Sequence, residues 1–582
     1  MLDAAVFRRR RGTAGSPGLR GFAAAPEDDE SDRRALELRM TQHRILLAAA
    51  LALLTAAPAL AQQADAARLN EHVRVLASDA FEGRGVATPG EQRTVDYLVG
   101  QFQALGLEPG GPDGSWVQTA QLGRTRQAGP ATITVSADGA SRALARGPDI
   151  LVSSDRPVNH ITVTDAEVVF AGYGVSAPER GWDDFKGMDL RGKVLLVIVN
   201  DPDFGAAEGH PVAGRFDGNA MTFYGRWTYK FQEAARQGAA GVLVIHDTAG
   251  AGYGWSVLEG SSTAPKFDIV RANPDAERVP AQGWIQGPVA AQLFAGAGLD
   301  YAALRAAART PEFAPVTLTG VRMSIDFGQT ADRIESRNVL ARIPGATHPD
   351  ETVLYGAHWD AYGRATPVGD DDIYNGAVDN ATGVAGLIEL ARLFKAGPAP
   401  DRSVVFAAWT AEEAGLLGAE YYAANPVWPL ETTVANINMD SFLPGAEISP
   451  QIVVMGAGKS ETDAWLERRA TEQGRTLIPD PAPQAGGYYR SDHFPLAKKG
   501  VPALFGFAGF TGHNAASRDY VANRYHKPSD EWTSDWVMDG AAVDVDLLYL
   551  VGRDLADSRA WPEWNAGAEF EAARAVSAAA RE

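Results

Sequence analysis

The stretch that decides the fold is residues 353–413, which read VLYGAHWDAYGRATPVGDDDIYNGAVDNATGVAGLIELARLFKAGPAPDRSVVFAAWTAEE. It begins with a short apolar run, 353–357, and ends with a second one, 403–409. Runs of this kind are typical of buried strands. Between them, apolar residues recur at helical spacing over 384–394, and Gly397 with the following proline ends that helix. The order strand, helix, strand predicts neighbouring parallel strands in an α/β domain.

The same alternation continues on the carboxyl side, with further apolar runs at 433–439, 452–455 and 503–507. We therefore predict a mixed, mostly parallel sheet flanked by helices. The region from about 145 to 320 is richer in short β-type runs and contains a helix-like stretch at 229–236. The expected domains are a catalytic domain at 62–144 and 321–560, a β-rich inserted domain at 145–320, and a tail at 561–582.

The N-terminus has the composition of a targeting segment. Residues 1–39 show no steady period, and we interpret them as a non-structural extension or a misassigned start. Residues 40–61 combine a basic start, an apolar run and an A-x-A site that places cleavage after Ala61. The apolar run 45–60 contains Pro58 and is shorter than the roughly 20 residues that span a membrane. We expect export to the periplasm or the extracellular space, with no stable membrane span after cleavage.

Length and composition set further bounds. A chain of 582 residues exceeds one core of about 250–300 residues, so more than one domain is expected. The net charge of −20 disfavours nucleic acid and anionic membranes as partners. Because the chain has no cysteine, a metal site must use histidine and carboxylate ligands. The oligomeric state stays open.

Acids and histidines stand directly after the predicted strands or in turns. They are His358, Asp360, Asp379, Glu412, Glu413, Asp440 and His526. Ligands in open α/β sheets bind beyond the carboxyl ends of the strands, so these side chains should converge on one edge. Each of these residues alone could have a purely structural role. Glu413, for example, could belong to a helix capping box with Thr410. Together they supply what a pair of divalent ions sharing one carboxylate needs, and they predict a metallohydrolase.

Six short motifs in this order resemble the M28 family of zinc peptidases. They read Gly356-Ala-His-Trp-Asp360, Gly376-Ala-Val-Asp-Asn-Ala-Thr-Gly383, Thr410-Ala-Glu-Glu-Ala-Gly415, Asn438-Met-Asp440, Ser491-Asp-His-Phe494 and Tyr525-His-Lys-Pro-Ser-Asp530. The resemblance implies a zinc exopeptidase, or phosphorylase/hydrolase-like, fold. Glu82-Gly-Arg-Gly85 resembles the N-terminal helical region of that family. The inserted region resembles a protease-associated (PA) domain in Phe170-Ala-Gly-Tyr-Gly174, Asp189-Leu-Arg-Gly-Lys-Val194 and Gly238-Ala-Ala-Gly-Val-Leu-Val244.

Carried over to matching positions, the resemblance implies a role for each site residue. The metal ligands would be His358 and Asp440 on one zinc ion, Glu413 and His526 on the other, and Asp379 bridging both. Glu412 would be the general base that activates the metal-bridging water, Asp360 would orient His358, and Tyr525 would donate to the developing oxyanion. It also implies a cis peptide at Asp379–Asn380. His493 is interpreted as structural or as lying behind the ligands.

These observations predict an exported zinc enzyme that hydrolyses peptide bonds, and we expect an aminopeptidase that releases N-terminal residues. Other divalent ions fit the same ligands. Carboxypeptidase or dipeptidase selectivity stays open, because Arg490 lies near the expected pocket and could hold a terminal carboxylate. An inactive binding ectodomain and a single-zinc glutaminyl cyclase are alternatives of another class, which the complete ligand set disfavours. The preferred side chain is not determined.

Overall fold

The computed structural model describes residues 63–137, 139–262, 264–509 and 514–581. The predicted extension and signal peptide at 1–61 lie outside the described residues. Within those ranges, no helix combines the length and the apolar character that crossing a membrane requires.

The catalytic half is built on a sheet that has β13 (His348–His358) at its centre. Its two neighbours, β16 (Arg402–Trp409) and β17 (Thr433–Asn438), run parallel to it, and β20 (Ala503–Leu504) runs parallel to β17. On the other side of β16 lies β12 (Val316–Ile343), which is antiparallel to it. The prediction of a mixed, mostly parallel sheet flanked by helices is confirmed.

One predicted strand divides between two sheets. The run 503–507 gives β20 and then β21 (Gly506–Phe507), with a break between them. The second strand joins a small separate sheet with β18 (Gln451–Val454) and β19 (Thr476–Pro479).

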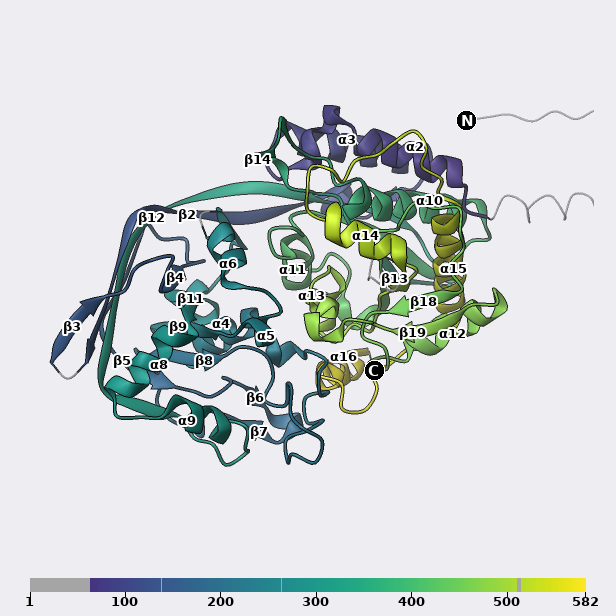
Figure 1. Cartoon of the computed structure of the whole chain (residues 1–582). Coiled ribbons are helices and arrows are strands. Elements are labelled where there is room, and N and C mark those ends of the chain that lie inside the picture. Colours follow the sequence, from purple (N-terminus) through teal and green to yellow (C-terminus); the bar gives the residue numbers. More distant parts are fainter. Residues whose placement is uncertain (1–62, 138, 263, 510–513, 582) are drawn as a thin grey trace, which may run out of the picture. The chain divides into compact units, whose positions relative to one another are not determined.

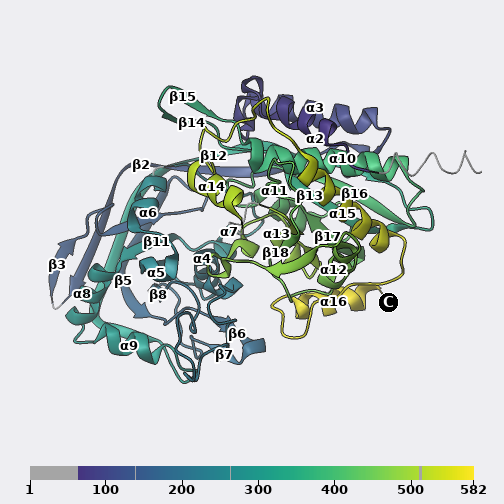
Figure 2. The same ribbon diagram turned by 45° about the vertical axis from the view of Figure 1, so that its right-hand side comes forward.

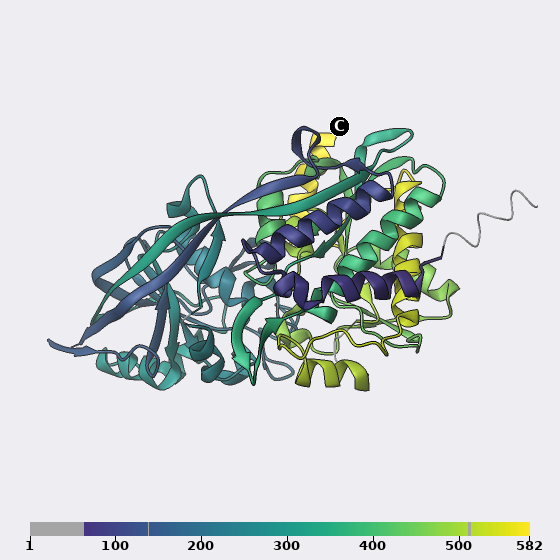
Figure 3. The same cartoon turned by 90° about the horizontal axis from the view of Figure 1, so that it is seen from above.

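Side chains alternate between the two faces of the central sheet. Val353 and Tyr355 of β13 belong to the cluster under one helical layer, and Leu354 belongs to the cluster under the other. The first layer consists of α2 (Ala66–Leu76), α3 (Pro89–Ala104), α10 (Gly383–Ala396), α12 (Thr462–Glu472) and α15 (Asp539–Ala556). The second has α11 (Leu417–Ala424) and α13 (His493–Ala497). Figure 3 shows α2, α3 and α10 together on one side.

Two long antiparallel strands carry the chain into the inserted half. They are β2 (Val117–Ala137) and β12, which share a nearly continuous hydrogen-bonded ladder (Figures 1 and 2). The predicted border at 320/321 therefore falls inside β12. A border based on composition is misplaced here, because the two halves share strands instead of a linker.

The inserted half continues the same sheet in the order β12-β5-β8-β9-β11-β4. Its strands are β3 (Ala140–Ala143), β4 (Ile150–Ser153), β5 (His160–Phe170), β6 (Ser176–Ala177), β7 (Trp182–Asp183), β8 (Val194–Ile198), β9 (Gly241–His246), β10 (Lys266–Ile269) and β11 (Ala281–Gln286). Its helices are α4 (Trp227–Arg236), α5 (Thr248–Ala251), α6 (Trp255–Ser261), α7 (Pro274–Glu277), α8 (Gly287–Gly296) and α9 (Tyr301–Ala307). The remaining elements are β1 (Glu108–Pro109), the hairpin β14 (Gly363–Val368) and β15 (Asp371–Tyr374), and α14 (Ala515–Asn523).

The C-terminal segment is packed, which corrects the expectation of a loose tail at 561–582. It forms α16 (Glu571–Arg581), and the buried Arg574 guanidinium donates to the carbonyls of Thr433 and Val434. The Trp564 indole is buried and donates to the Gly500 carbonyl. The alanine-rich composition gave no indication that Trp564 and Arg574 would anchor this segment, because both side chains bond to residues far away in the chain.

Candidate metal centre

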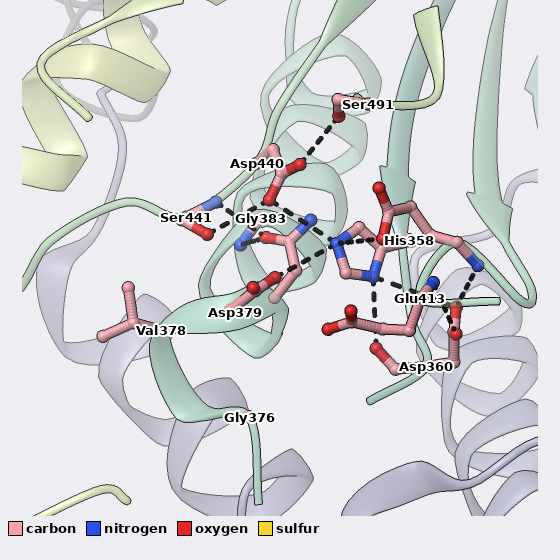
Figure 4. A network of polar contacts seen from close by, with 12 residues as sticks. His358, Asp360, Gly376, Val378, Asp379, Gly383, Glu413, Asp440, Ser441 and Ser491 are labelled. Carbon is pink, nitrogen blue, oxygen red and sulfur yellow. Dashed lines mark hydrogen bonds and ion pairs between the residues drawn. The ribbon is translucent and has the colours of Figure 1, made fainter. Parts of the chain in front are cut away.

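The register of the central sheet brings two predicted ligands together. Gly356 of β13 pairs with Asn438 of β17, and each is followed two residues later by a ligand, His358 and Asp440. Parallel strands end at the same edge, so both side chains point to one place. His358 Nε2 lies 3.5 Å from Asp440 Oδ1 and 3.2 Å from Asp379 Oδ1 (Figure 4).

A second group of ligand atoms lies on the other side of Asp379. His526 Nε2 is 3.2 Å from Asp379 Oδ2 and 3.5 Å from Glu413 Oε2. Asp379 thus offers one carboxylate oxygen to each histidine. Among the described residues, the groups able to hold a metal ion are His358, Asp379 and Asp440, and Asp379, Glu413 and His526. The structure therefore brings together all five residues for which the sequence predicted ligand roles.

The donors of this site fit a pair of divalent cations. His358 is buried, and its Nε2 atom, aimed at the carboxylates, has no hydrogen-bond partner. Burial favours the neutral ring, but Glu412, Asp440 and Asp379 outweigh it and raise the pKa of His358 well above its usual value. Burial also works to raise the pKa of Asp379, yet the two histidine rings outweigh it and lower that pKa. The cluster therefore favours positive charge at its centre.

Glu412 lies beside the ligands without belonging to either group. Its Oε2 atom is 3.9 Å from His358 Nε2. Burial, and then the neighbouring charges of Glu413, Asp492 and Asp440, raise its pKa well above the usual value, although His358 opposes them. A carboxyl at this position can act as a general base or acid for a group bound between the ligands.

Asp360 differs from its implied role. Its carboxylate is 3.8 Å from His358 Nδ1, whereas its backbone carbonyl is 3.1 Å from that nitrogen. The carboxylate instead accepts the backbone N–H groups of Glu412 and Glu413, at 3.0 and 3.3 Å. Asp360 therefore orients the histidine through its main chain, and its side chain holds the turn that carries the two glutamates.

Tyr525 lies against the second group. Its ring stacks on the imidazole of His526, with 3.7 Å between centroids. Burial raises its pKa well above the usual value, so the hydroxyl keeps its proton at neutral pH. The Nδ1 atom of His526 is 3.1 Å from the hydroxyl of Tyr362, a contact that sequence reasoning missed.

Other polar residues around the ligands were also missed. Ser491 donates to Asp440 Oδ2 at 2.7 Å, and Asp530 accepts the backbone N–H groups of Val378 and Asp379 at 2.9 and 3.0 Å. Both residues lie within motifs quoted for the resemblance, so the signal was present. The buried carboxylate of Asp492 has no hydrogen-bond partner.

One smaller prediction is confirmed, because the Asp379–Asn380 peptide is cis. From the sequence, His493 is interpreted as structural or as lying behind the ligands. It is buried against the rings of Tyr488 and Phe505, and burial lowers its pKa to about 3.

Comparison with known proteins agrees with this site. Residues 338–548 match the model of peptidase family M28. This stretch contains all five predicted metal ligands. This part of the chain is thus similar to peptidase family M28, and the match confirms the predicted resemblance to that family. The match does not extend over the inserted half, whose identity as a PA domain stays a prediction.

The relatives of this domain are peptidases of two kinds. Mouse (Mus musculus) aminopeptidase NAALADL1 is 41% identical over 111 residues, which are 18% of this chain and 13% of that protein. A glutamate carboxypeptidase 2 homolog of Caenorhabditis briggsae is 28% identical over 253 residues, covering 38% of this chain and 29% of that protein. The chain thus spans only a small part of these curated relatives. An aminopeptidase structure from Aneurinibacillus sp. strain AM-1 covers 85% of this chain and 94% of its own, with 20% identity and a TM-score of 0.45.

Proposed function

We propose that this chain is an exported zinc exopeptidase with two zinc ions and that it acts as an aminopeptidase. The observation that carries the proposal is the shared carboxylate of Asp379, which faces one histidine with each of its oxygens. His358 and Asp440 would complete one ion's ligands, and Glu413 and His526 the other's. When bound, the ions would supply Lewis acidity and make water more acidic.

The chain's own residues supply the proton transfers. Glu412 would take a proton from the attacking water and pass it to the leaving amine, a role for which its raised pKa suits it. The Tyr525 hydroxyl, protonated at neutral pH, would donate a hydrogen bond to the carbonyl oxygen as negative charge develops there. Asp360 would keep Glu412 in place by holding its backbone N–H.

Substrate assays test the proposed selectivity. The purified protein, loaded with zinc, is given amino-acid 4-nitroanilides in one series and N-blocked dipeptides in another. We expect turnover of the free-amine substrates and two zinc ions per chain by elemental analysis. Turnover confined to N-blocked substrates would contradict the aminopeptidase assignment, and absence of any peptide hydrolysis would favour a binding ectodomain.

Export is proposed from residues 40–61 alone. Expression of the full chain in a Gram-negative host, followed by separation of the periplasm, is expected to yield a mature protein that begins at Gln62. N-terminal sequencing checks the cleavage site. A protein that stays in the cytoplasm with an intact N-terminus would argue against a signal peptide.

Two arginines favour a second candidate function, carboxypeptidase or dipeptidase activity. Burial, with the neighbouring charge of Arg490, lowers the pKa of Arg226 to about 10, and the Nε atom of Arg226 has no hydrogen-bond partner. Neither side chain forms an ion pair with any acid in the described ranges. Arg226 lies just after Met221, whose N–H donates to the Pro483 carbonyl in the catalytic half. The charge of Arg490 acts to lower the pKa of Tyr525, against the effect of burial. A pair of unneutralised guanidinium groups suits a substrate carboxylate.

A matched substrate pair separates the two candidates. An N-acetyl dipeptide with a free carboxylate is compared with its C-terminal amide, using the parent protein and Arg226→Ala. A carboxypeptidase is expected to prefer the free acid and to lose that preference in the variant. Equal rates on both substrates in the parent would count against this second function.

A further inference from the structure

Arg84, the arginine of the Glu82-Gly-Arg-Gly85 motif, is fully buried. Its guanidinium group lies against the main chain beside the metal ligands. Its Nε donates to the carbonyl of Trp359 at 2.7 Å, and its Nη2 donates to that of Gly376 at 2.7 Å. Its Nη1 donates to the carbonyls of Leu76 and Asn375, at 2.9 and 2.6 Å. One side chain thus binds four main-chain oxygens from three separate segments.

Three of these four carbonyls belong to the segments that carry metal ligands. Trp359 directly follows His358, while Asn375 and Gly376 open the loop that leads to Asp379. Figure 4 shows Gly376 and Asp379 at the two ends of this stretch. The guanidinium therefore fixes the end of β13 relative to that loop. These are the two segments whose side chains must meet at 3.2 Å for the first metal group to form.

The same loop is held with the opposite polarity from its other side. The Asp530 carboxylate accepts the N–H groups of Val378 and Asp379, and its backbone carbonyl accepts that of Ala377. Two carbonyls at the start of the loop thus accept from the Arg84 guanidinium, and two N–H groups further along donate to the Asp530 carboxylate. Arg84 and Asp530 therefore satisfy main-chain groups of this loop that would otherwise be buried without a partner.

The main chain around Arg84 is shaped to deliver this side chain. Glu82, Gly83 and Arg84 have φ values of 49°, 64° and 50°, a conformation that costs free energy for residues other than glycine. A Cβ atom on residue 83 would lie 2.5 Å from the carbonyl oxygen of Tyr374. Glycine is therefore required at this close approach, and the turn can direct Arg84 inward.

The charge of Arg84 also suits the site. Burial lowers its pKa to about 10, while Asp530, Asp360, Asp379 and Glu413 work against that lowering. The side chain thus stays cationic at neutral pH. It forms no direct ion pair with a carboxylate, because all its hydrogen bonds go to neutral carbonyls. The four acids therefore stabilise its positive charge without a direct ion pair, Asp530 most strongly.

We infer that Arg84 is a positioning residue for the metal centre, one that holds His358 and Asp379 in ligand geometry. This inference rests on the proposed function, since it concerns the affinity of the same site for zinc. Removing a group that orients metal ligands typically weakens metal binding by about 10–100-fold.

The test measures zinc affinity directly, with no substrate. Arg84→Met is compared with Arg574→Met, which removes an equally buried guanidinium that also donates to main-chain carbonyls, at the end of β17 away from Asp440. Each full-length variant is titrated with zinc against a competing chelator, and its melting temperature is recorded. We expect both variants to lose stability, but only Arg84→Met to bind zinc about 10–100-fold more weakly.

Arg84→Lys covers the case in which Arg84→Met does not fold. Lysine keeps the charge but lacks the planar fork that reaches four carbonyls, so weaker zinc binding than in the parent is expected. Parental zinc affinity in Arg84→Lys or Arg84→Met would overturn the inference, and so would an equal loss in Arg574→Met. These outcomes are independent of peptide turnover: a parent protein that binds zinc without hydrolysing peptides would sink the proposed function and leave this test intact.

Discussion

Asp379 is the single residue on which both metal groups depend. Its two carboxylate oxygens lie 3.2 Å from His358 Nε2 and 3.2 Å from His526 Nε2. The other ligands each serve one group. The consequences of losing a ligand should therefore differ between the shared position and the outer ones.

Asp379→Ala is expected to bind neither zinc ion firmly, whereas His526→Ala should retain one ion. The reason is that the first variant removes an oxygen from both groups, and the second removes a nitrogen from only one. Zinc content after dialysis, measured by elemental analysis, checks the two values. Two tightly held ions in Asp379→Ala would show that this carboxylate does not bridge.

Glu412→Gln separates proton transfer from metal binding. The substitution keeps the size and burial of the side chain but removes its ability to accept a proton, so kcat is expected to fall by about 10²–10⁴-fold. Zinc content should stay at the parental value, because Glu412 belongs to neither metal group. Parental turnover in this variant would mean that another group acts as the base.

At the scale of elements, the C-terminal segment closes the far end of the catalytic half. Trp564 is 5% exposed and donates its indole N–H to Gly500, and Arg574 reaches the start of β17. The helix α16 thus braces a strand whose other end carries Asp440. Its contribution to stability can be measured apart from the chemistry of the site.

Trp564→Ala is expected to lower the free energy of unfolding by about 3–5 kcal/mol, the usual cost of removing a buried large aromatic side chain. Val576→Ala serves as the control on α16, because Val576 is 75% exposed and surface changes stay within about 0.5 kcal/mol. Urea unfolding followed by tryptophan fluorescence and circular dichroism gives both values. If Trp564→Ala were as stable as the control, the segment would not brace the fold in solution.

At the scale of the whole molecule, the buried acids couple metal content to pH. Burial raises the pKa of Glu413 to about 7 in the metal-free protein, and it raises the pKa of Glu412 and Asp492 well above their usual values. In the unfolded chain these groups titrate near 4.5 or below. A carboxyl whose pKa is raised on folding stabilises the fold below the unfolded value, and that stability is lost as pH rises through the folded value.

The metal-free protein should accordingly lose stability as pH rises from about 4.5 to about 7. Zinc held by Glu413 and the other ligands would offset the negative charge of the cluster, so the zinc-loaded protein should lose less stability over this range. Melting temperatures of chelator-treated and zinc-loaded samples at several pH values check this, and the gap between them is expected to widen from pH 5 to pH 8. A gap that does not change with pH would contradict the prediction.

Much of the catalytic half could be predicted because its signals are local. The apolar runs at 353–357 and 403–409 predict strands from their own residues, and they lie in β13 and β16 respectively. His358 and Asp440 directly follow such strands, so their convergence follows from the parallel sheet alone. The length of β2 could not be read in this way, since a strand continues for as long as a partner strand supplies hydrogen bonds.

The sequence by itself determined the fold class, the ligand types and the edge of the sheet at which the ligands meet. Strand ends and helical spacing are patterns of neighbouring residues, and the absence of cysteine is a property of the composition. Only the tertiary structure decided which atom each side chain serves. The Asp360 carboxylate accepts two backbone N–H groups, and only its main-chain carbonyl contacts the imidazole. The Arg84 side chain is buried and donates to main-chain carbonyls next to the ligands. Such choices depend on groups far apart in the chain, which folding alone brings within hydrogen-bond distance.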